Sequence, residues 1–234
     1  MKYERILVIS DMHQPYSHPD LIAFLKEIKN KFKPDCVVCI GDEIDGHSIS
    51  FHDHNPDLDN AGREFRQAIK GLSNVYALFP KVFIVDSNHG SLVYRRAIAS
   101  GLPHGVIKSY RDMLEAPKGW VWSDDLVLYA SNNQQIYFHH SRGSDVLKVS
   151  QQMGMSVVQG HSHSQFEIRY WSNPNHLHFG MTVGCLINNK SLAFAYNKLQ
   201  VKRPIIGCGI IIDGQPKLLP MVLNKNGRWI KKLV

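Results

Sequence analysis

Five short apolar runs in the first 160 residues each end in polar residues that can bind a metal. The runs lie at 6–9, 37–40, 82–85, 136–138 and 157–158. A short apolar run bounded by polar residues is typical of a buried strand. Because open α/β sheets place their sites at the carboxyl ends of the strands, we expect the polar residues after these five runs to lie together.

Helices are predicted between the first strands. Apolar residues recur at helical spacing over 21–32 and again over about 60–79. Strands that alternate with helices in this way pair in parallel, because each helix carries the chain back to the start of the next strand.

The pattern changes to period two after Gly160. It predicts one hairpin from 166–171 and 176–179, and a second from 207–212 and 218–222. We expect both hairpins to lie in a second sheet. The predicted fold class is therefore α/β, as an αββα sandwich of two mixed β-sheets flanked by helices.

The polar residues after the runs form five motifs of carboxylate, amide and imidazole groups. In chain order they are Asp11-x-His13, Gly41-Asp42-x-x-Asp45, Asn88-His89, His139-His140 and Gly160-His161-x-His163. Any one of these residues could simply cap a strand end or lie in a solvated turn. Five sets in register favour a metal site, because oxygen and imidazole ligands together suit first-row metals.

This ordered set resembles the calcineurin-like metallophosphoesterase superfamily, with a layout similar to phage and bacterial members. The resemblance covers about residues 5–165. Two departures qualify it. The third motif reads Ser87-Asn88-His89-Gly90, where the family has Gly before and an acidic residue after. Gly46 follows Asp45, where protein Ser/Thr phosphatases have Arg, which argues against that branch.

The resemblance implies two divalent metal ions, with Asp42 as the ligand that bridges them. It assigns Asp11, His13 and His163 to the first ion, and Asn88, His161 and one histidine of the 139/140 pair to the second. The family has a small residue after this histidine, so Ser141 favours His140 over His139. We expect Mn²⁺, with Fe, Zn²⁺ or Ni²⁺ as alternatives.

The resemblance also implies the catalytic roles. A pair of cations neutralises the phosphate oxygens and converts a bridging water to the attacking hydroxide. His89 is expected to protonate the leaving oxygen, and Asp45 to hold the other nitrogen of the His89 ring.

Residues 91–118 are predicted to form a helical insertion near the site. Arg95, Arg96 and Arg111, with aromatic residues interleaved, could hold a nucleotide by phosphate contact and stacking, and His139 is a further candidate substrate contact. The alternative is that these arginines lie on solvated helix faces.

Composition supports a phosphate-bearing substrate and a soluble protein of one domain. The 234 residues are expected to form a single domain, 1–234, and carry a net charge of +7, which favours polyanionic partners. Four cysteines are interpreted as core residues. Because no apolar stretch is long enough to span a membrane and no signal peptide is recognised, we expect a soluble, cytoplasmic protein, in the host cytoplasm if viral. The oligomeric state is left open.

The predicted function is a metal-dependent phosphatase or phosphodiesterase that acts on nucleotides or nucleic-acid ends. A DNA nuclease is the main alternative, although such members usually carry a capping domain after the last motif and 165–234 leaves no room for one. A protein phosphatase or a non-catalytic scaffold is less favoured, because His89 and every ligand position are filled.

Overall fold

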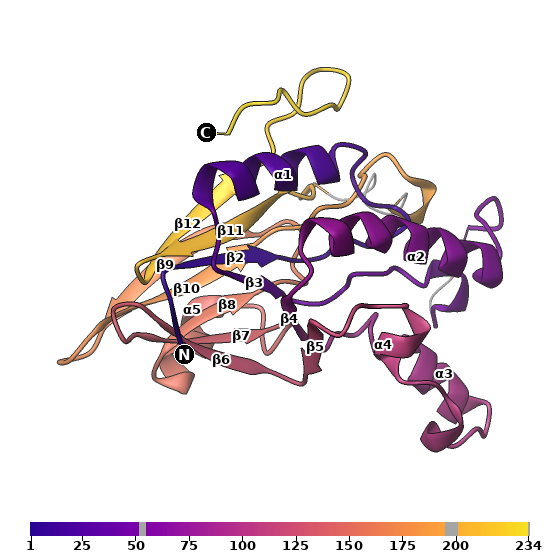
Figure 1. Cartoon of the computed structure of the whole chain (residues 1–234), viewed down its shortest axis with the longest axis horizontal. Helices are drawn as coiled ribbons and strands as arrows, with labels where there is room; N and C mark the ends of the chain where they lie inside the picture. The colour runs from indigo at the N-terminus through magenta and orange to yellow at the C-terminus, as the bar shows by residue number, and fades with distance from the viewer. Residues whose placement is uncertain (52–54, 195–200, 234) are drawn as a thin grey trace.

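The computed structural model describes residues 1–51, 55–194 and 201–233, and two sheets pack face to face within them (Figure 1). The first sheet has the order β12 (Gln215–Pro220), β11 (Gly207–Ile212), β2 (Arg5–Ile9), β3 (Cys36–Cys39), β4 (Val82–Val85), β5 (Trp120–Ser123). The second has the order β1 (Lys2–Tyr3), β6 (Leu126–Ala130), β7 (Gln135–His139), β8 (Ser156–Gln159), β10 (Leu177–Val183), β9 (Phe166–Ser172).

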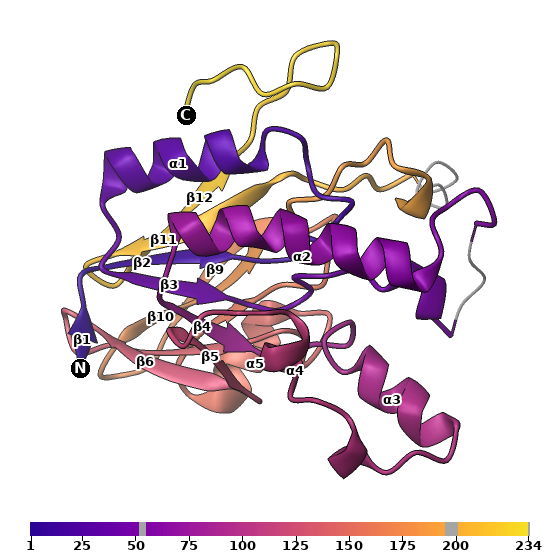
Figure 2. The same cartoon turned by 45° about the vertical axis from the view of Figure 1, so that its right-hand side comes forward.

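Helices cover both outer faces, which confirms the predicted αββα sandwich. Helices α1 (Leu21–Phe32) and α2 (Ala61–Leu78) lie along the first sheet, as Figure 2 shows, while α5 (Val146–Met153) packs on the second. Strands β2, β3, β4 and β5 pair in parallel, as the alternation of strands and helices predicts.

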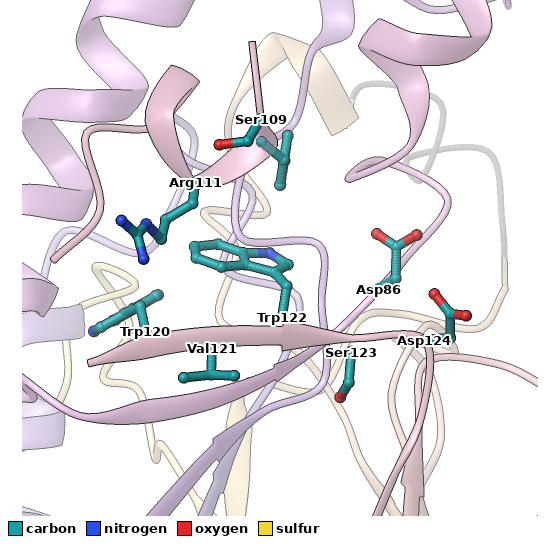
Figure 3. Close-up of a pocket in the computed structure, with 9 residues that line it drawn as sticks. Asp86, Ser109, Arg111, Trp120, Val121, Trp122, Ser123 and Asp124 are labelled. Atoms are coloured by element: carbon teal, nitrogen blue, oxygen red, sulfur yellow. The ribbon is translucent and has the colours of Figure 1, made fainter. Parts of the chain in front are cut away.

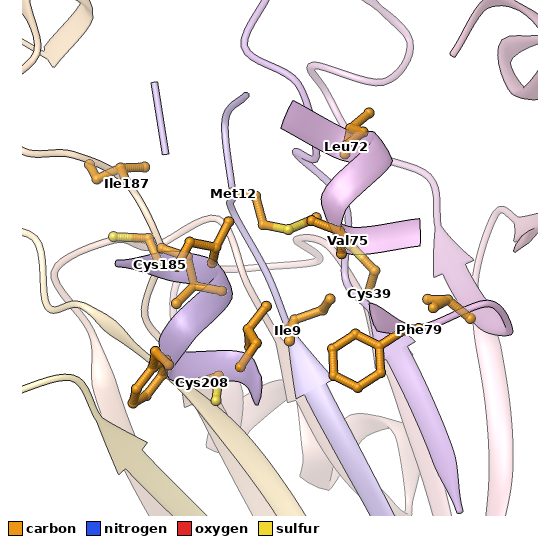
Figure 4. Close-up of a cluster of buried hydrophobic side chains, with 14 of the residues drawn as sticks. Ile9, Met12, Cys39, Leu72, Val75, Phe79, Cys185, Ile187 and Cys208 are labelled. Carbon is orange, nitrogen blue, oxygen red and sulfur yellow. The ribbon is translucent and has the colours of Figure 1, made fainter. Parts of the chain in front are cut away.

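Alternation along the central strands divides the core into layers. In β2, Ile6 and Val8 lie between the two sheets, whereas Leu7 and Ile9 face α1 and α2. Figure 4 shows the helix-side layer, in which Ile9 and Cys39 lie near side chains of α2. All four cysteines are buried and unpaired, as the sequence predicts; burial raises the pKa of the Cys36 thiol to about 12.

The last hairpin corrects one prediction. Strand β11 pairs antiparallel with β2, so β11 and β12 extend the first sheet and only β9 and β10 join the second. The physical reason is the burial of both faces of β11: Ile210 packs on the helix side and Ile211 between the sheets. Pairing with β2 buries both isoleucine side chains, because one face of the sheet there is covered by helices and the other by the second sheet. Strand β12 also begins at Gln215, earlier than predicted.

The segment between β4 and β5 carries α3 (Leu92–Ala99) and α4 (Tyr110–Met113), with a 3₁₀ turn, η2 (His104–Val106), between them. It projects from one end of the first sheet (Figures 1 and 2). A second 3₁₀ turn, η1 (His47–Ile49), follows β3 and contacts α3. Within the described ranges, no helix is long and apolar enough to cross a membrane.

Candidate metal centre

The loops after β2, β3, β4, β7 and β8 meet at one end of the sandwich, so both sheets contribute to the site. Four residues of these loops other than glycine have a left-handed backbone: Asp11 (φ 51°), His13 (φ 47°), Asp42 (φ 49°) and His161 (φ 66°). A residue with a Cβ adopts this conformation at a cost of about 1–3 kcal/mol, and such residues gather at functional sites. The surrounding hydrogen bonds hold them, as in Asp11 N–H to the Gly41 carbonyl at 3.1 Å.

Two glycines allow the loops to approach one another. A Cβ on Gly160 would lie 2.0 Å from the Ser10 hydroxyl oxygen and 2.7 Å from an oxygen of Asp11. Gly41 has φ 83°, and a Cβ there would lie 2.4 Å from the Ser87 Cβ. The close approach of the loops therefore leaves no room for a side chain at Gly41 of the second motif or at Gly160 of the fifth.

Asp11, His13 and His163 form the first cluster of predicted ligands. The His163 Nε2 lies 3.1 Å from Asp11 Oδ1 and 3.2 Å from His13 Nε2. Asp11 and His13 are buried, and His163 is partly exposed. Donor atoms from three residues thus converge on one small volume.

Asn88, His140 and His161 form the second cluster. The His140 Nε2 lies 2.8 Å from Asn88 Oδ1 and 3.2 Å from His161 Nδ1. Asp42 lies between the clusters: its Oδ2 is 3.2 Å from His140 Nε2 and 3.5 Å from His13 Nε2. The structure thus brings all seven predicted ligands together, with Asp42 between the two clusters.

In their neutral form, two histidines would leave acceptor lone pairs facing other acceptors. His140 Nδ1 lies 2.7 Å from the Ile40 carbonyl, which can only accept, so Nδ1 carries the proton. His13 Nδ1 lies 2.8 Å from the Asp45 carboxylate, which fixes the same tautomer. In both neutral rings the bare Nε2 therefore points at carboxylate or amide oxygens. A cation relieves this arrangement, and its mixed nitrogen and oxygen ligands fit Mn²⁺, Fe or Zn²⁺.

Charges in the cluster raise the pKa values of two histidines and lower that of Asp42, so the charged form of each group is favoured. Burial lowers the pKa of His140, but Asp42 outweighs burial and raises it to about 9. Burial also lowers the pKa of His13, but hydrogen bonds to Asp11 and Asp45 raise it well above the ordinary value. Burial raises the pKa of Asp42, and His140 and His89 outweigh it, so the net pKa is low. In the metal-free protein, protonated histidines therefore balance the carboxylates.

Asp45 holds His13 with its carboxylate and His89 with its backbone. His89 Nδ1 donates to the Asp45 carbonyl, while the carboxylate accepts from His13 Nδ1 at 2.8 Å. This corrects the expectation that the Asp45 carboxylate holds His89. The reason is local: the turn that begins at Gly46 (φ 67°) leaves the Asp45 carbonyl facing His89. The His89 ring lies against the His13 ring, with centroids 4.6 Å apart.

The remaining predicted residues lie at the margin. His139 is buried and stacks on Tyr137 with ring centroids 5.1 Å apart, and burial lowers its pKa to about 4. Arg95 donates to the Asn88 carbonyl at 2.6 Å. Arg96 donates to the carbonyls of Ile49 and Ser50, which ties α3 to the loop after β3. Arg111 lines a cavity beside β5, away from the ligand clusters.

Sequence reasoning missed the groups that support the ligands. The Ser87 hydroxyl accepts from the backbone N–H of Asp42 at 2.9 Å, and the Ser10 hydroxyl donates to Asp11. The Ile40 carbonyl orients His140, and no side-chain pattern reveals a backbone acceptor. Ser10 and Ser87 stand at strand ends beside ligands, and that position was the available signal.

Comparisons with known proteins agree with this fold. The family model for calcineurin-like phosphoesterases matches residues 4–203. No curated protein matches the chain. Among solved structures, Vps29 from Chaetomium thermophilum has a TM-score of 0.51 at 13% identity, with 100% of this chain and 94% of that one covered.

Two further similar structures are hydrolases by name. An archaeal phosphodiesterase has a TM-score of 0.48 at 16% identity and covers 92% of this chain and 99% of its own. The E. coli phosphoesterase Yfce has a TM-score of 0.45 at 13% identity, with 98% of each chain covered. On the match over residues 4–203, the chain belongs to the calcineurin-like phosphoesterase family and is a metal-dependent phosphoester hydrolase.

Proposed function

We propose that this protein is a two-metal phosphatase or phosphodiesterase for nucleotides or nucleic-acid ends. The observation that carries the proposal is the convergence of six candidate ligand side chains around Asp42. Asp11, His13 and His163 would hold one divalent cation, and Asn88, His140 and His161 the other. We favour Mn²⁺, because this ion accepts carboxylate, amide and imidazole ligands together.

The cations, when bound, supply positive charge for the phosphate oxygens and lower the pKa of water. The protein's own residues do the rest. The Nδ1 proton of His89 is held by the Asp45 carbonyl, so a second proton on Nε2 would leave that hydrogen bond intact. That Nε2 proton is the one we assign to the leaving oxygen, whose departure as an alkoxide needs an acid near neutral pH.

A DNA nuclease is the second candidate, supported by the net charge of +7. We place a nucleotide or short nucleic-acid end first, since the described strands after the last motif all belong to the two sheets of the sandwich. The scaffold alternative is disfavoured by a complete ligand set together with His89.

Removal of metal should abolish hydrolysis of bis(p-nitrophenyl) phosphate. Mn²⁺ should restore it better than Mg²⁺, which prefers oxygen ligands and retains its waters. His13→Ala should lose activity in the same assay. The matched control is His176→Ala, since His176 is an exposed histidine in the connection between β9 and β10. Activity that persists in excess EDTA would end the two-metal proposal.

Mn²⁺ binding should release protons. His140 has a pKa of about 9 in the metal-free protein, so at pH 7.5 it is protonated and must lose that proton to bind a metal. The apparent affinity should rise with pH by about tenfold per unit for each proton displaced, and should level off above about pH 9. Calorimetry in two buffers of different ionisation enthalpy measures the release. An affinity that stays constant between pH 7 and 9 contradicts this assignment.

Asp45→Ala separates the two roles considered for the Asp45 carboxylate. Because that carboxylate orients His13, its loss should weaken metal binding by about 10–100-fold, and raised Mn²⁺ should restore most of the rate. Asp57→Ala, at an exposed carboxylate, is the control. If saturating Mn²⁺ leaves the deficit unchanged, the carboxylate acts on His89 instead.

His89→Asn should lower turnover by about 10²–10⁴-fold while metal content stays near wild type. The loss should shrink for p-nitrophenyl esters, whose leaving group departs without a proton, and remain large for alkyl esters. Elemental analysis and turnover numbers on the two ester classes decide the point. Equal losses on both classes, or a missing metal, would make His89 a ligand or structural residue.

A further inference from the structure

We propose that a groove from the second ligand cluster to Trp122 binds the nucleoside part of the substrate, as an uncharged group that bears hydroxyls and a flat aromatic base. This inference rests on the proposed function, because it assigns the substrate class of the same site. It concerns residues outside the metal centre.

Two neighbouring cavities form the groove. The first, of about 400 Å³, includes Asn88, His140 and His161 in its wall and so opens beside the second cluster. The other, of about 380 Å³, lies beside β5 and α4. Asp86 and Asp124 line both cavities, so these two carboxylates mark the junction. Each volume is in the range of ligand pockets, about 300–1,000 Å³.

The register of the first sheet explains why the carboxylates lie side by side. Val85 of β4 pairs with Ser123 of β5, and each of them is followed by an aspartate. The Asp86 N–H also donates to the Ser123 carbonyl at 2.9 Å. Figure 3 shows both carboxylates at the end of β5. They accept hydrogen bonds from sugar hydroxyls or an amino group, the donors that a nucleoside offers.

An aromatic wall continues beyond the carboxylates. The indole of Trp122 stands up from β5, and Arg111 extends from α4 toward the same space (Figure 3). The Trp122 ring packs edge-on against the Tyr110 ring, with ring centroids 5.9 Å apart. The ring of the buried Trp120 also lies close, with its centroid 6.2 Å from that of Trp122. A fixed, partly exposed indole beside a guanidinium is a surface on which a base stacks, at about 1–3 kcal/mol per base.

The charged groups that line the groove are two carboxylates, Asp86 and Asp124, and two guanidinium groups, Arg142 in the first cavity and Arg111 in the second. Asp86 and Asp124 lie between the ligand cluster and Trp122, so a chain of further phosphates running this way would meet two carboxylates. The two carboxylates at the junction repel a phosphate, while the two arginines balance their charge over the groove as a whole. The groove therefore fits a neutral nucleoside attached to the phosphate at the metals.

The test compares two diesters that share one charge and one leaving group, methyl p-nitrophenyl phosphate and adenosine 5′-(p-nitrophenyl phosphate), with Mn²⁺-loaded protein. Wild type should prefer the adenosine ester in kcat/KM by about 100-fold. Trp122→Leu and Asp124→Asn should each reduce this preference by about tenfold, mainly through KM. Asp124 is exposed, so Asp124→Asn keeps the test decisive if Trp122→Leu unfolds; Tyr170→Leu, at an exposed aromatic on β9, is the control.

Calorimetry with adenosine alone separates the two proposals. Adenosine binding that Asp124→Asn weakens, in a protein that hydrolyses neither diester, would support the groove and reject the proposed function. Hydrolysis of both diesters at equal kcat/KM, without adenosine binding, would reject the groove and leave the proposed function standing.

Discussion

Acceptor lone pairs crowd around the Asp42 carboxylate, and the rest of the site depends on how that crowding is relieved. Two imidazoles are locked with Nδ1 as the donor, so each presents a bare Nε2 to the same carboxylate, at 3.5 Å for His13 and 3.2 Å for His140. Buried acceptors without a donor or cation are costly. Protons on the histidines relieve the crowding in the metal-free protein, and two divalent cations would relieve it in the active one. Binding of the two cations would therefore require the histidines that face Asp42 to lose their protons.

The fold creates this crowding by joining five strand ends from two sheets. Strands β2, β3 and β4 bring Asp11, Asp42 and Asn88 from the first sheet, and β7 and β8 bring His140 and His161 from the second. The inter-sheet core fixes the distance between the two sets. The loops pass so closely that only glycine fits at two of their contacts, and several ligand residues adopt a left-handed backbone. The free energy gained by packing the core therefore offsets the backbone strain at the predicted ligand residues.

Sequence reasoning was most successful where a repeating pattern and a local motif coincide. The five buried strands, α1 and α2, and the two hairpins follow from hydrophobic periodicity, and the strand-end motifs indicated which side chains would meet. It was wrong about the sheet that β11 and β12 join, because that choice depends on burial of both faces of Ile210 and Ile211. Strand β5 was also missed: exposed Val121 lies between Trp120 and Trp122, and only the pairing with β4 identifies the run as an edge strand.

The finer geometry of the site needed three-dimensional contacts. The sequence placed Asp45 beside the predicted catalytic histidine, but it could not show that the carboxylate faces His13 while the backbone carbonyl faces His89. Backbone carbonyls such as that of Ile40 leave no mark in a sequence. The groove beside Trp122 depends on strand register, which joins Asp86 and Asp124 from segments 38 residues apart in the numbering.

Anomalous diffraction from crystals soaked in Mn²⁺ tests the central claim most directly. The account predicts two peaks about 3.5–4 Å apart, with Asp42 in contact with both, His13 and His163 on one side and His140 and His161 on the other. A single peak, or two peaks of which only one touches Asp42, would contradict it.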